Sequence, residues 1–290
     1  MDDLVSTGWL AEHLGEPGLV VLDASLHLPD AGRDAAAEFA AAHPPGARFL
    51  DLASLTDPAS AVPAALATGE QVAARLRQLG VGPGDRVVLY DDSAIRSSAR
   101  AWFLLRLRGF DRVAILDGGL GKWRAEGRPL EAGAPVPAPA PGWQPAADRL
   151  AVRSKADMIA NLASRAEQVV DARGAGRFSG AEPESRPGLA SGHIPGSLNL
   201  PYGKVLAEDG TFRSPEALRA IFAEAGIDPE RPIVTTCGSG VTAAVVLFAL
   251  RLAGREDVAL YDGSWSEWGA DPATPKAGAG AGAQSGGTAE

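Results

Sequence analysis

The single cysteine of this 290-residue chain, Cys237, lies where a nucleophile could be activated. It follows an apolar run, residues 232–236, that is typical of a buried strand, and it precedes an apolar helical pattern that begins at Val241. Between them, the Gly-Ser-Gly sequence of residues 238–240 lets the backbone bend so that successive N–H groups point inward. The helix start adds its positive dipole end, so we predict that Cys237 is a nucleophilic thiolate. A buried, inert cysteine at a tight turn is the alternative.

The elements around this loop belong to one half of a duplicated sequence. Asp23 corresponds to Asp171 and His43 to His193, so the copies are 148 and 150 residues apart at these points. Two further matches keep the same order, namely residues 79–81 with 225–227 and residues 116–123 with 261–268. Ordered matches at a nearly constant offset predict two copies of one fold, each of about 120 to 130 residues.

The two copies differ at the position of the cysteine. Asp92 lies 21 residues before Val113, and Cys237 lies 21 residues before Val258, so we expect Asp92 to be the counterpart of Cys237. An aspartate cannot perform thiol chemistry. We therefore predict that the first copy is catalytically silent and that the second is the catalytic one.

Short apolar runs alternate with helical patterns in each copy. In the second copy we expect strands at residues 168–171, 233–236 and 258–261, and helices at residues 214–225 and 241–253. Ser214 and Pro215 are typical of an N-cap and a first helical turn. Strands that alternate with helices indicate an α/β fold, in which each copy has a mainly parallel sheet flanked by helices.

These patterns divide the chain into four parts. Residues 1–130 are expected to form the silent domain, and residues 151–270 the catalytic domain. Residues 131–150 are rich in proline and alanine, which predicts a semi-rigid extended linker. Residues 271–290 contain almost no large apolar side chain, so we expect a disordered tail.

The charge and the cysteine count exclude several functions. The formal net charge of −9 is opposite to what binding to nucleic acid or to an anionic membrane requires. No apolar stretch reaches the roughly 18 residues of a membrane span. One cysteine cannot form an intramolecular disulfide and the N-terminus has no signal pattern, so we expect a cytoplasmic protein.

No metal site or cofactor is expected. No cluster of His and Cys has the spacing of metal ligands. His43 and His193 lie in matching turns of both copies, the silent one included, so we predict that they serve the fold.

The motifs of both copies resemble those of the tandem-domain rhodanese-type sulfurtransferases. The resemblance covers the chain up to about residue 270 and follows the order of the family. It is carried by residues 22–25 (Leu-Asp-Ala-Ser), 192–197 (Gly-His-Ile-Pro-Gly-Ser), 237–242 (Cys-Gly-Ser-Gly-Val-Thr) and 262–268 (Asp-Gly-Ser-Trp-Ser-Glu-Trp). It implies two rhodanese-like domains and a sulfur carried on Cys237.

Within that family, the loop after Cys237 resembles that of the 3-mercaptopyruvate sulfurtransferases. Thiosulfate-using rhodaneses place basic side chains directly after the cysteine, whereas Gly238 and Ser239 follow it here. The resemblance also implies that Arg177 and Arg186 hold the carboxylate of the substrate, a task that suits planar guanidinium groups. Solvated loop arginines are the alternative.

The role of Ser239 differs from one proposed for some members of the family, which is a Ser–His–Asp relay. The corresponding first-domain segment, residues 51–64, contains no His, so Ser239 is expected to act as a hydrogen-bond donor. The resemblance thus implies Cys237 and Ser239 as catalytic residues. The substrate-binding residues that it implies are Arg177, Arg186, Gly238, Gly240, Val241 and Thr242.

The implied reaction moves sulfur from 3-mercaptopyruvate to Cys237 and releases pyruvate. The persulfide then passes its outer sulfur to cyanide, a small thiol or a thioredoxin-like protein. Thiosulfate is the alternative donor. A cysteine phosphatase would need an arginine six residues after the cysteine, where this chain has Ala243. A non-enzymatic interaction module fits the first copy but not the second, which retains the cysteine.

Overall fold

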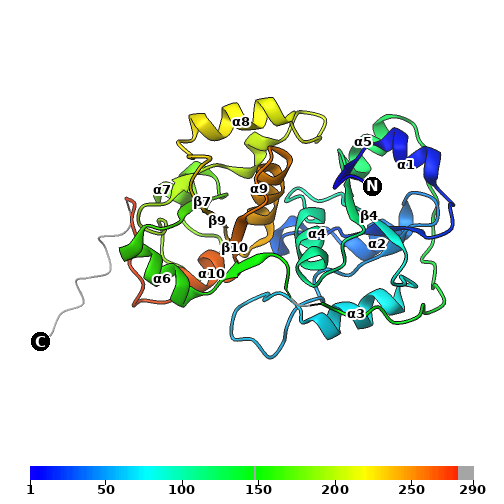
Figure 1. Ribbon diagram of the computed structural model, residues 1–290, viewed down its shortest axis with the longest axis horizontal. Coiled ribbons are helices and arrows are strands. Elements are labelled where there is room, and N and C mark those ends of the chain that lie inside the picture. Colours follow the sequence, from blue (N-terminus) through cyan, green and yellow to red (C-terminus); the bar gives the residue numbers. More distant parts are fainter. Residues whose placement is uncertain (147, 280–290) are drawn as a thin grey trace, which may run out of the picture. The chain divides into compact units, whose positions relative to one another are not determined.

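The computed structural model describes residues 1–146 and 148–279, which fall into two compact units. Unit 1 contains Met1–Ala59, Leu66–Leu150 and Leu206–Phe212. Unit 2 contains Ser60–Ala65, Ala151–Val205 and the described residues from Arg213 onward. Figure 1 shows a sheet with surrounding helices in each unit.

Unit 1 is built on a parallel sheet of five strands in the order β1-β5-β4-β2-β3. The strands are β1 (Leu4–Val5), β2 (Leu19–Asp23), β3 (Arg48–Phe49), β4 (Arg86–Tyr90) and β5 (Val113–Leu116). The helices are α1 (Thr7–His13), η1 (Pro29–Ala31), α2 (Ala35–Ala41), α3 (Gly69–Gln78), α4 (Ser98–Leu107) and α5 (Gly119–Ala125).

Unit 2 repeats this plan, with a parallel sheet in the equivalent order β6-β10-β9-β7-β8. The strands are β6 (Ala151–Arg153), β7 (Gln168–Asp171), β8 (Leu198–Asn199), β9 (Ile233–Thr236) and β10 (Val258–Tyr261). The helices are α6 (Lys155–Ser164), α7 (Ala175–Ser179), η2 (Tyr202–Val205), α8 (Pro215–Glu224), α9 (Val241–Leu252) and α10 (Ser264–Trp268). The α/β fold with parallel sheets is therefore confirmed.

The central strands of unit 2 are buried along their whole length because helices cover both faces of the sheet. In Figure 1, α6 and α10 lie on one side of this sheet and α8 and α9 on the other. On the first side, Val234 and Ala259 share a core cluster with Trp265 and Trp268 of α10. On the other side, α9 packs on β9 and β10. This packing fixes the carboxyl end of β9, where Cys237 follows.

The local signals for the helices of unit 2 act as expected. The Ser214 side chain accepts a hydrogen bond from the backbone N–H of Ala217, and Pro215 occupies the first turn of α8. Both α8 and α9 end one residue before the position expected from the sequence.

The chain after α10 differs from the expected disordered tail. Ala277 exchanges two backbone hydrogen bonds with His193, and the Thr274 hydroxyl donates to the backbone carbonyl of Trp268. These bonds order residues 271–279 against unit 2 although the segment has few apolar side chains. The remainder of the expected tail, residues 280–290, lies outside the described residues.

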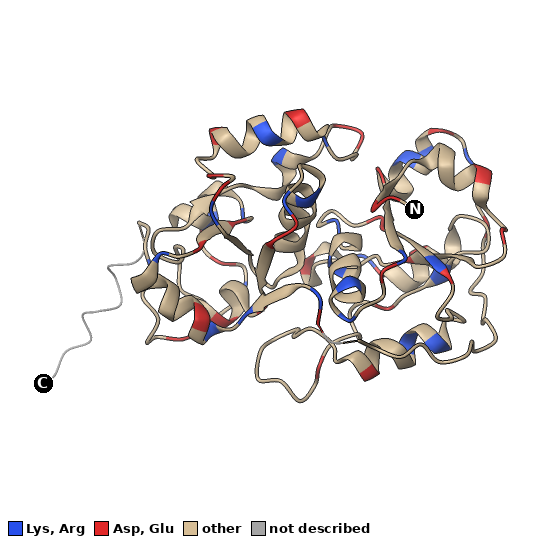
Figure 2. Cartoon of the chain, viewed as in Figure 1, with Lys and Arg blue, Asp and Glu red and all other residues tan. Residues whose placement is uncertain are grey.

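Charged side chains of both signs are interspersed over the two units, as Figure 2 shows. In the described part of the chain, no helix is long and apolar enough to cross a membrane.

Candidate active site

Cys237 directly follows β9 and is 2% exposed. It therefore lies at the carboxyl end of the sheet, the edge at which α/β proteins generally bind their ligands. Gly240 is the N-cap of α9 and has a φ of 77°, a left-handed conformation that favours glycine. The 12-residue helix α9 begins at Val241, so its positive dipole end faces this loop.

The first two residues of α10 fix the backbone of Cys237. The Ser264 hydroxyl accepts from the Cys237 N–H at 3.2 Å and donates to the Tyr261 carbonyl at 2.8 Å. The Trp265 N–H donates to the Cys237 carbonyl at 2.9 Å. Both backbone groups of Cys237 are thus held by α10, and the side chain remains as its reactive part.

The loop that follows offers free donors. Across residues 1–146 and 148–279, no group accepts a hydrogen bond from the backbone N–H of Gly238, Ser239 or Gly240. The Ser239 side chain is half-buried, as is that of Thr242 at the second position of α9, whereas Val241 is buried. Unpaired N–H groups beside a helix start form a concave site for negative charge.

Arg186 reaches this loop through a serine. Arg186 Nη1 donates to Ser266 Oγ at 2.6 Å, and Ser266 Oγ donates to the Gly238 carbonyl at 2.6 Å. The backbone N–H of Ser266 donates to the same carbonyl at 2.8 Å. Ser266 therefore links the Arg186 guanidinium to the residue after Cys237.

Arg177 reaches the loop from α7. A Cβ atom placed on Gly238 would lie 3.3 Å from Arg177 Nη2, so the guanidinium is directly beside this glycine. Glu184 holds Arg177, because its Oε2 accepts from Nη2 at 2.5 Å and from Nε at 3.2 Å. The structure thus brings both predicted arginines to the Cys237 loop.

A buried network of ion pairs holds Glu184, the partner of Arg177, in place. Glu184 Oε1 accepts from Arg173 Nη1 at 2.6 Å, and Arg173 also donates to both oxygens of Asp171. The side chains of Arg173, Asp171 and Glu184 are each only 1% exposed. Burial works against the charge of Arg173, but the two carboxylates outweigh it and raise the pKa of the guanidinium above its ordinary value. The Arg173 guanidinium also lies 4.3 Å from the ring centroid of Trp265.

The corresponding loop of unit 1 corrects one sequence-based expectation. Asp23 pairs with Tyr90, just as Asp171 pairs with Thr236, so the residue that follows Tyr90 is the counterpart of Cys237. That residue is Asp91, not Asp92. Counting back from β5 was wrong by one residue because the connection between β4 and β5 is one residue longer than that between β9 and β10.

In unit 1 the Asp91 carboxylate occupies the cradle, meaning the backbone N–H donors of the loop and of the helix start, whereas the equivalent donors after Cys237 stay open. This carboxylate accepts from the backbone N–H of Ser93 at 3.0 Å and from that of Ser98, the first residue of α4, at 2.9 Å. The N–H groups that could bind an anion in unit 1 are thus satisfied within the chain. This arrangement agrees with a silent first copy.

The two histidines in matching turns have matching contacts. His43 stacks on Phe39 and its Nδ1 bonds the Phe39 carbonyl, while His193 stacks on Phe178 and its Nδ1 bonds the Phe178 carbonyl. Equivalent contacts in both units support a role in the fold. Among the described residues, no group of three or more His, Cys, Asp or Glu side chains could hold a metal ion.

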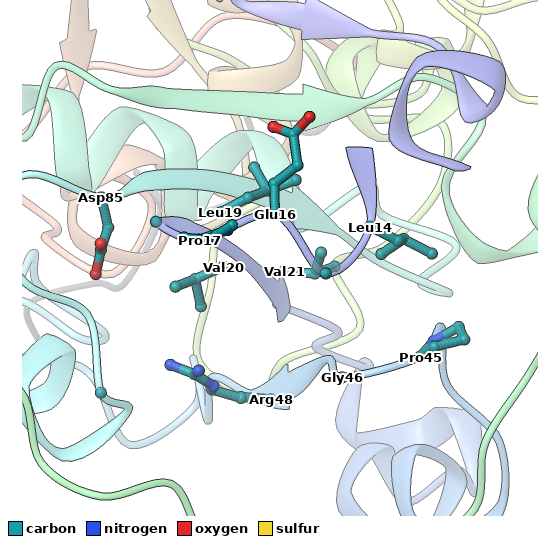
Figure 3. A pocket seen from close by; sticks show the side chains of 13 residues that line it. Leu14, Glu16, Pro17, Leu19, Val20, Val21, Pro45, Gly46, Arg48 and Asp85 are labelled. Atoms are coloured by element: carbon teal, nitrogen blue, oxygen red, sulfur yellow. The ribbon is translucent and has the colours of Figure 1, made fainter. Parts of the chain in front are cut away.

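The cavities of the two units lie away from this chemistry. A cavity of about 630 Å³ is lined by residues such as Val20, Pro45, Arg48 and Asp85 at the amino end of β2, as Figure 3 shows. A smaller one, of about 300 Å³, lies at the amino end of β7 in unit 2. Each cavity lies at the amino end of its own sheet, the end opposite Asp91 in unit 1 and opposite Cys237 in unit 2, so the pair is a repeated feature of the fold rather than part of the candidate site.

Sequence reasoning did not identify three residues that shape the site, namely Ser264, Ser266 and Glu184. Ser264 and Ser266 belong to the motif of residues 262–268, and Glu184 lies between the two arginines in the sequence. Ser264 and Ser266 act on partners 27 and 80 positions away. Glu184 pairs with arginines 7 and 11 positions before it, and no local pattern in the sequence specifies that pairing.

The family model for the rhodanese-like domain matches residues 6–126 and again residues 154–271. The chain therefore belongs to the rhodanese-like family, with two copies of its domain.

Relatives with known names are similar over nearly the whole chain. The 3-mercaptopyruvate sulfurtransferase of Homo sapiens is 44% identical over 91% of this chain and 91% of its own length. A thiosulfate sulfurtransferase of Cricetulus griseus is 41% identical over the same shares of both chains. The crystal structure of SseA from Escherichia coli, described as a 3-mercaptopyruvate sulfotransferase with the rhodanese fold, matches with a TM-score of 0.82 and 38% identity. It covers 92% of this chain and 100% of that one. Identity alone thus does not separate the two donors.

Proposed function

We propose that this protein transfers sulfur from 3-mercaptopyruvate through a persulfide on Cys237. The observation that carries the proposal is the convergence of Arg177 and Arg186 on the loop after Cys237. Two guanidinium groups beside a cysteine can hold the carboxylate of an α-keto acid while its sulfur meets the thiolate. The names of the human and Escherichia coli relatives support the same donor.

The first half-reaction is a displacement at sulfur. The Cys237 thiolate attacks the sulfur of 3-mercaptopyruvate, and the bond between that sulfur and C3 breaks. The electron pair of this bond leaves with pyruvate as its enolate, which then takes up a proton. The free N–H groups of residues 238–240 and the Ser239 hydroxyl stabilise the negative charge that develops.

The second half-reaction regenerates the thiolate. An acceptor nucleophile, which is cyanide, a small thiol or the thiol of a thioredoxin-like protein, attacks the outer sulfur of the persulfide, and Cys237 leaves as thiolate. No metal or organic cofactor takes part in either step. A cytoplasmic location, supported by the single cysteine, completes the proposal.

Thiosulfate is the second candidate donor, because relatives of similar identity are named thiosulfate sulfurtransferases. The neutral Gly238 beside Arg177 favours the keto acid. A wholly non-enzymatic interaction module fits unit 1, where Asp91 fills the cradle, but leaves the open Cys237 loop of unit 2 without a role.

Incubation with 3-mercaptopyruvate tests the proposal directly. We expect one added sulfur atom on the Cys237 peptide by mass spectrometry and one pyruvate released per persulfide in a single turnover. Cys237→Ser is expected to yield neither product. Absence of pyruvate from the wild-type protein, or full activity in Cys237→Ser, contradicts the proposal.

A further inference from the structure

We propose that Glu184 is a positioning residue that sets which sulfur donor the Cys237 site prefers. This inference rests on the function proposed above. It fixes the direction of Arg177 and reduces the positive charge that a donor meets. Glu184 itself is buried and does not touch the donor.

The geometry gives Glu184 control over Arg177. Its Oε2 accepts hydrogen bonds from Nη2 and Nε, along one edge of the Arg177 guanidinium. Within residues 1–146 and 148–279, nothing accepts a hydrogen bond from Nη1 of Arg177, and Nη2 is the atom closest to a Cβ placed on Gly238. Because Glu184 Oε1 is fixed by the buried Arg173, the carboxylate cannot turn away, and the free edge of Arg177 is held at the Cys237 loop.

The charges of the network give Glu184 its second effect. Asp171 and Glu184 offset two of the three arginines at the site, Arg173 and Arg177. In the described part of the chain, Arg186 forms no ion pair and contacts the neutral Ser266, so it supplies one uncompensated positive charge. The Cys237 thiolate faces either donor alike, and beside it this one positive charge matches the single carboxylate of a mercapto-keto acid. Thiosulfate carries two negative charges and would gain more from a site with a second uncompensated cation.

The test compares the two donors in Glu184→Gln, which removes the charge and keeps the size of the side chain, although its amide nitrogen can no longer accept from one of the two arginines. The ratio of kcat/KM for thiosulfate to kcat/KM for 3-mercaptopyruvate is expected to rise about tenfold, because the dianion gains one more unit of Coulomb attraction than the monoanion. A residue that served only the fold would lower both values together and leave the ratio unchanged. An unchanged or reduced ratio in the folded variant overturns the inference.

Glu184→Asp is the matched control, because it keeps the charge and shortens the side chain. We expect it to raise KM for 3-mercaptopyruvate, since its carboxylate no longer reaches both arginines, while the donor ratio stays within about twofold of wild type. A shift as large as that of Glu184→Gln would mean that charge does not set the preference.

The wild-type protein offers a measurement that does not depend on whether Glu184→Gln folds. Pyruvate, a monoanion, is expected to inhibit the first half-reaction at lower concentration than sulfate, a dianion of thiosulfate's shape. Sulfate inhibiting at the lower concentration overturns the inference. If wild type releases no pyruvate from 3-mercaptopyruvate, the proposed function itself fails; if it does and the donor ratio does not move, only the role of Glu184 fails.

Discussion

Replacing Ser266 with alanine should loosen Arg186 without disturbing the cysteine loop. The Ser266 hydroxyl accepts from Arg186 and donates to the Gly238 carbonyl, each at 2.6 Å. In Ser266→Ala the backbone N–H of residue 266 still donates to that carbonyl, so the loop keeps its support. Two hydrogen bonds of the hydroxyl are lost, the one from the Arg186 guanidinium and the one to the Gly238 carbonyl.

The size of the effect follows from the exposure of Arg186. A hydrogen bond from a charged donor contributes about 1.5 to 3 kcal/mol when it is buried. Arg186 is exposed, so water replaces part of the interaction, and about 1 kcal/mol remains. This corresponds to a fall of about fivefold in kcat/KM for 3-mercaptopyruvate. The role proposed for Arg186 is to bind the carboxylate in the ground state and in the transition state alike, so the change should appear in KM, with kcat within about twofold of wild type.

The assay is steady-state release of pyruvate at several concentrations of 3-mercaptopyruvate, with cyanide as acceptor. Ser185→Ala is a matched control, because Ser185 is an exposed serine directly before Arg186 and should leave both constants unchanged. The free energy of unfolding of Ser266→Ala, measured in urea, should fall by no more than about 1 to 2 kcal/mol, so the variant stays folded in the assay. An unchanged KM in a folded Ser266→Ala protein, or an equal loss of kcat with both donors, would refute the assigned role of Arg186.

Two further substitutions test the loop of each unit. Gly238→Ala places a Cβ atom 3.3 Å from Arg177 Nη2, and because Glu184 holds that side chain, we expect KM for 3-mercaptopyruvate to rise about threefold to tenfold in steady-state kinetics. Wild-type kinetics in this variant would show that Arg177 does not contact the donor. Asp91→Ala removes the acceptor of two buried N–H groups in unit 1, so urea unfolding should show a loss of about 1 to 2 kcal/mol while kcat stays unchanged. A large loss of kcat at normal stability would mean that the first copy takes part in the chemistry.

The strands and helices that carry the site were predictable from local patterns. Strands β7, β9 and β10 have the bounds expected from their apolar runs, and Ser214 caps α8 as its residue type indicates. These features depend on neighbours in the sequence, and a buried parallel strand is recognisable as a continuous apolar run.

Counting along the sequence failed where the loops differ in length. Asp92 was expected to match Cys237, but strand register makes Asp91 the counterpart. The extra residue between β4 and β5 cannot be recognised from composition. The pairing of β2 with β4, compared with that of β7 with β9, shows which residue corresponds to Cys237. The order of residues 271–279 likewise depends on a partner far away, His193, whose backbone bonds Ala277.

The sequence by itself determined that this chain is a duplicated α/β protein with one cysteine at a strand-to-helix turn, because those features are written in short windows of residues. Only the tertiary structure decided what surrounds Cys237. Ser264 holds its backbone from 27 positions away, and Ser266 joins Arg186 to its loop across a separation of 80. Such contacts form because parallel strands bring their carboxyl ends to one edge of the sheet, where the segments that follow them meet regardless of their distance in the chain.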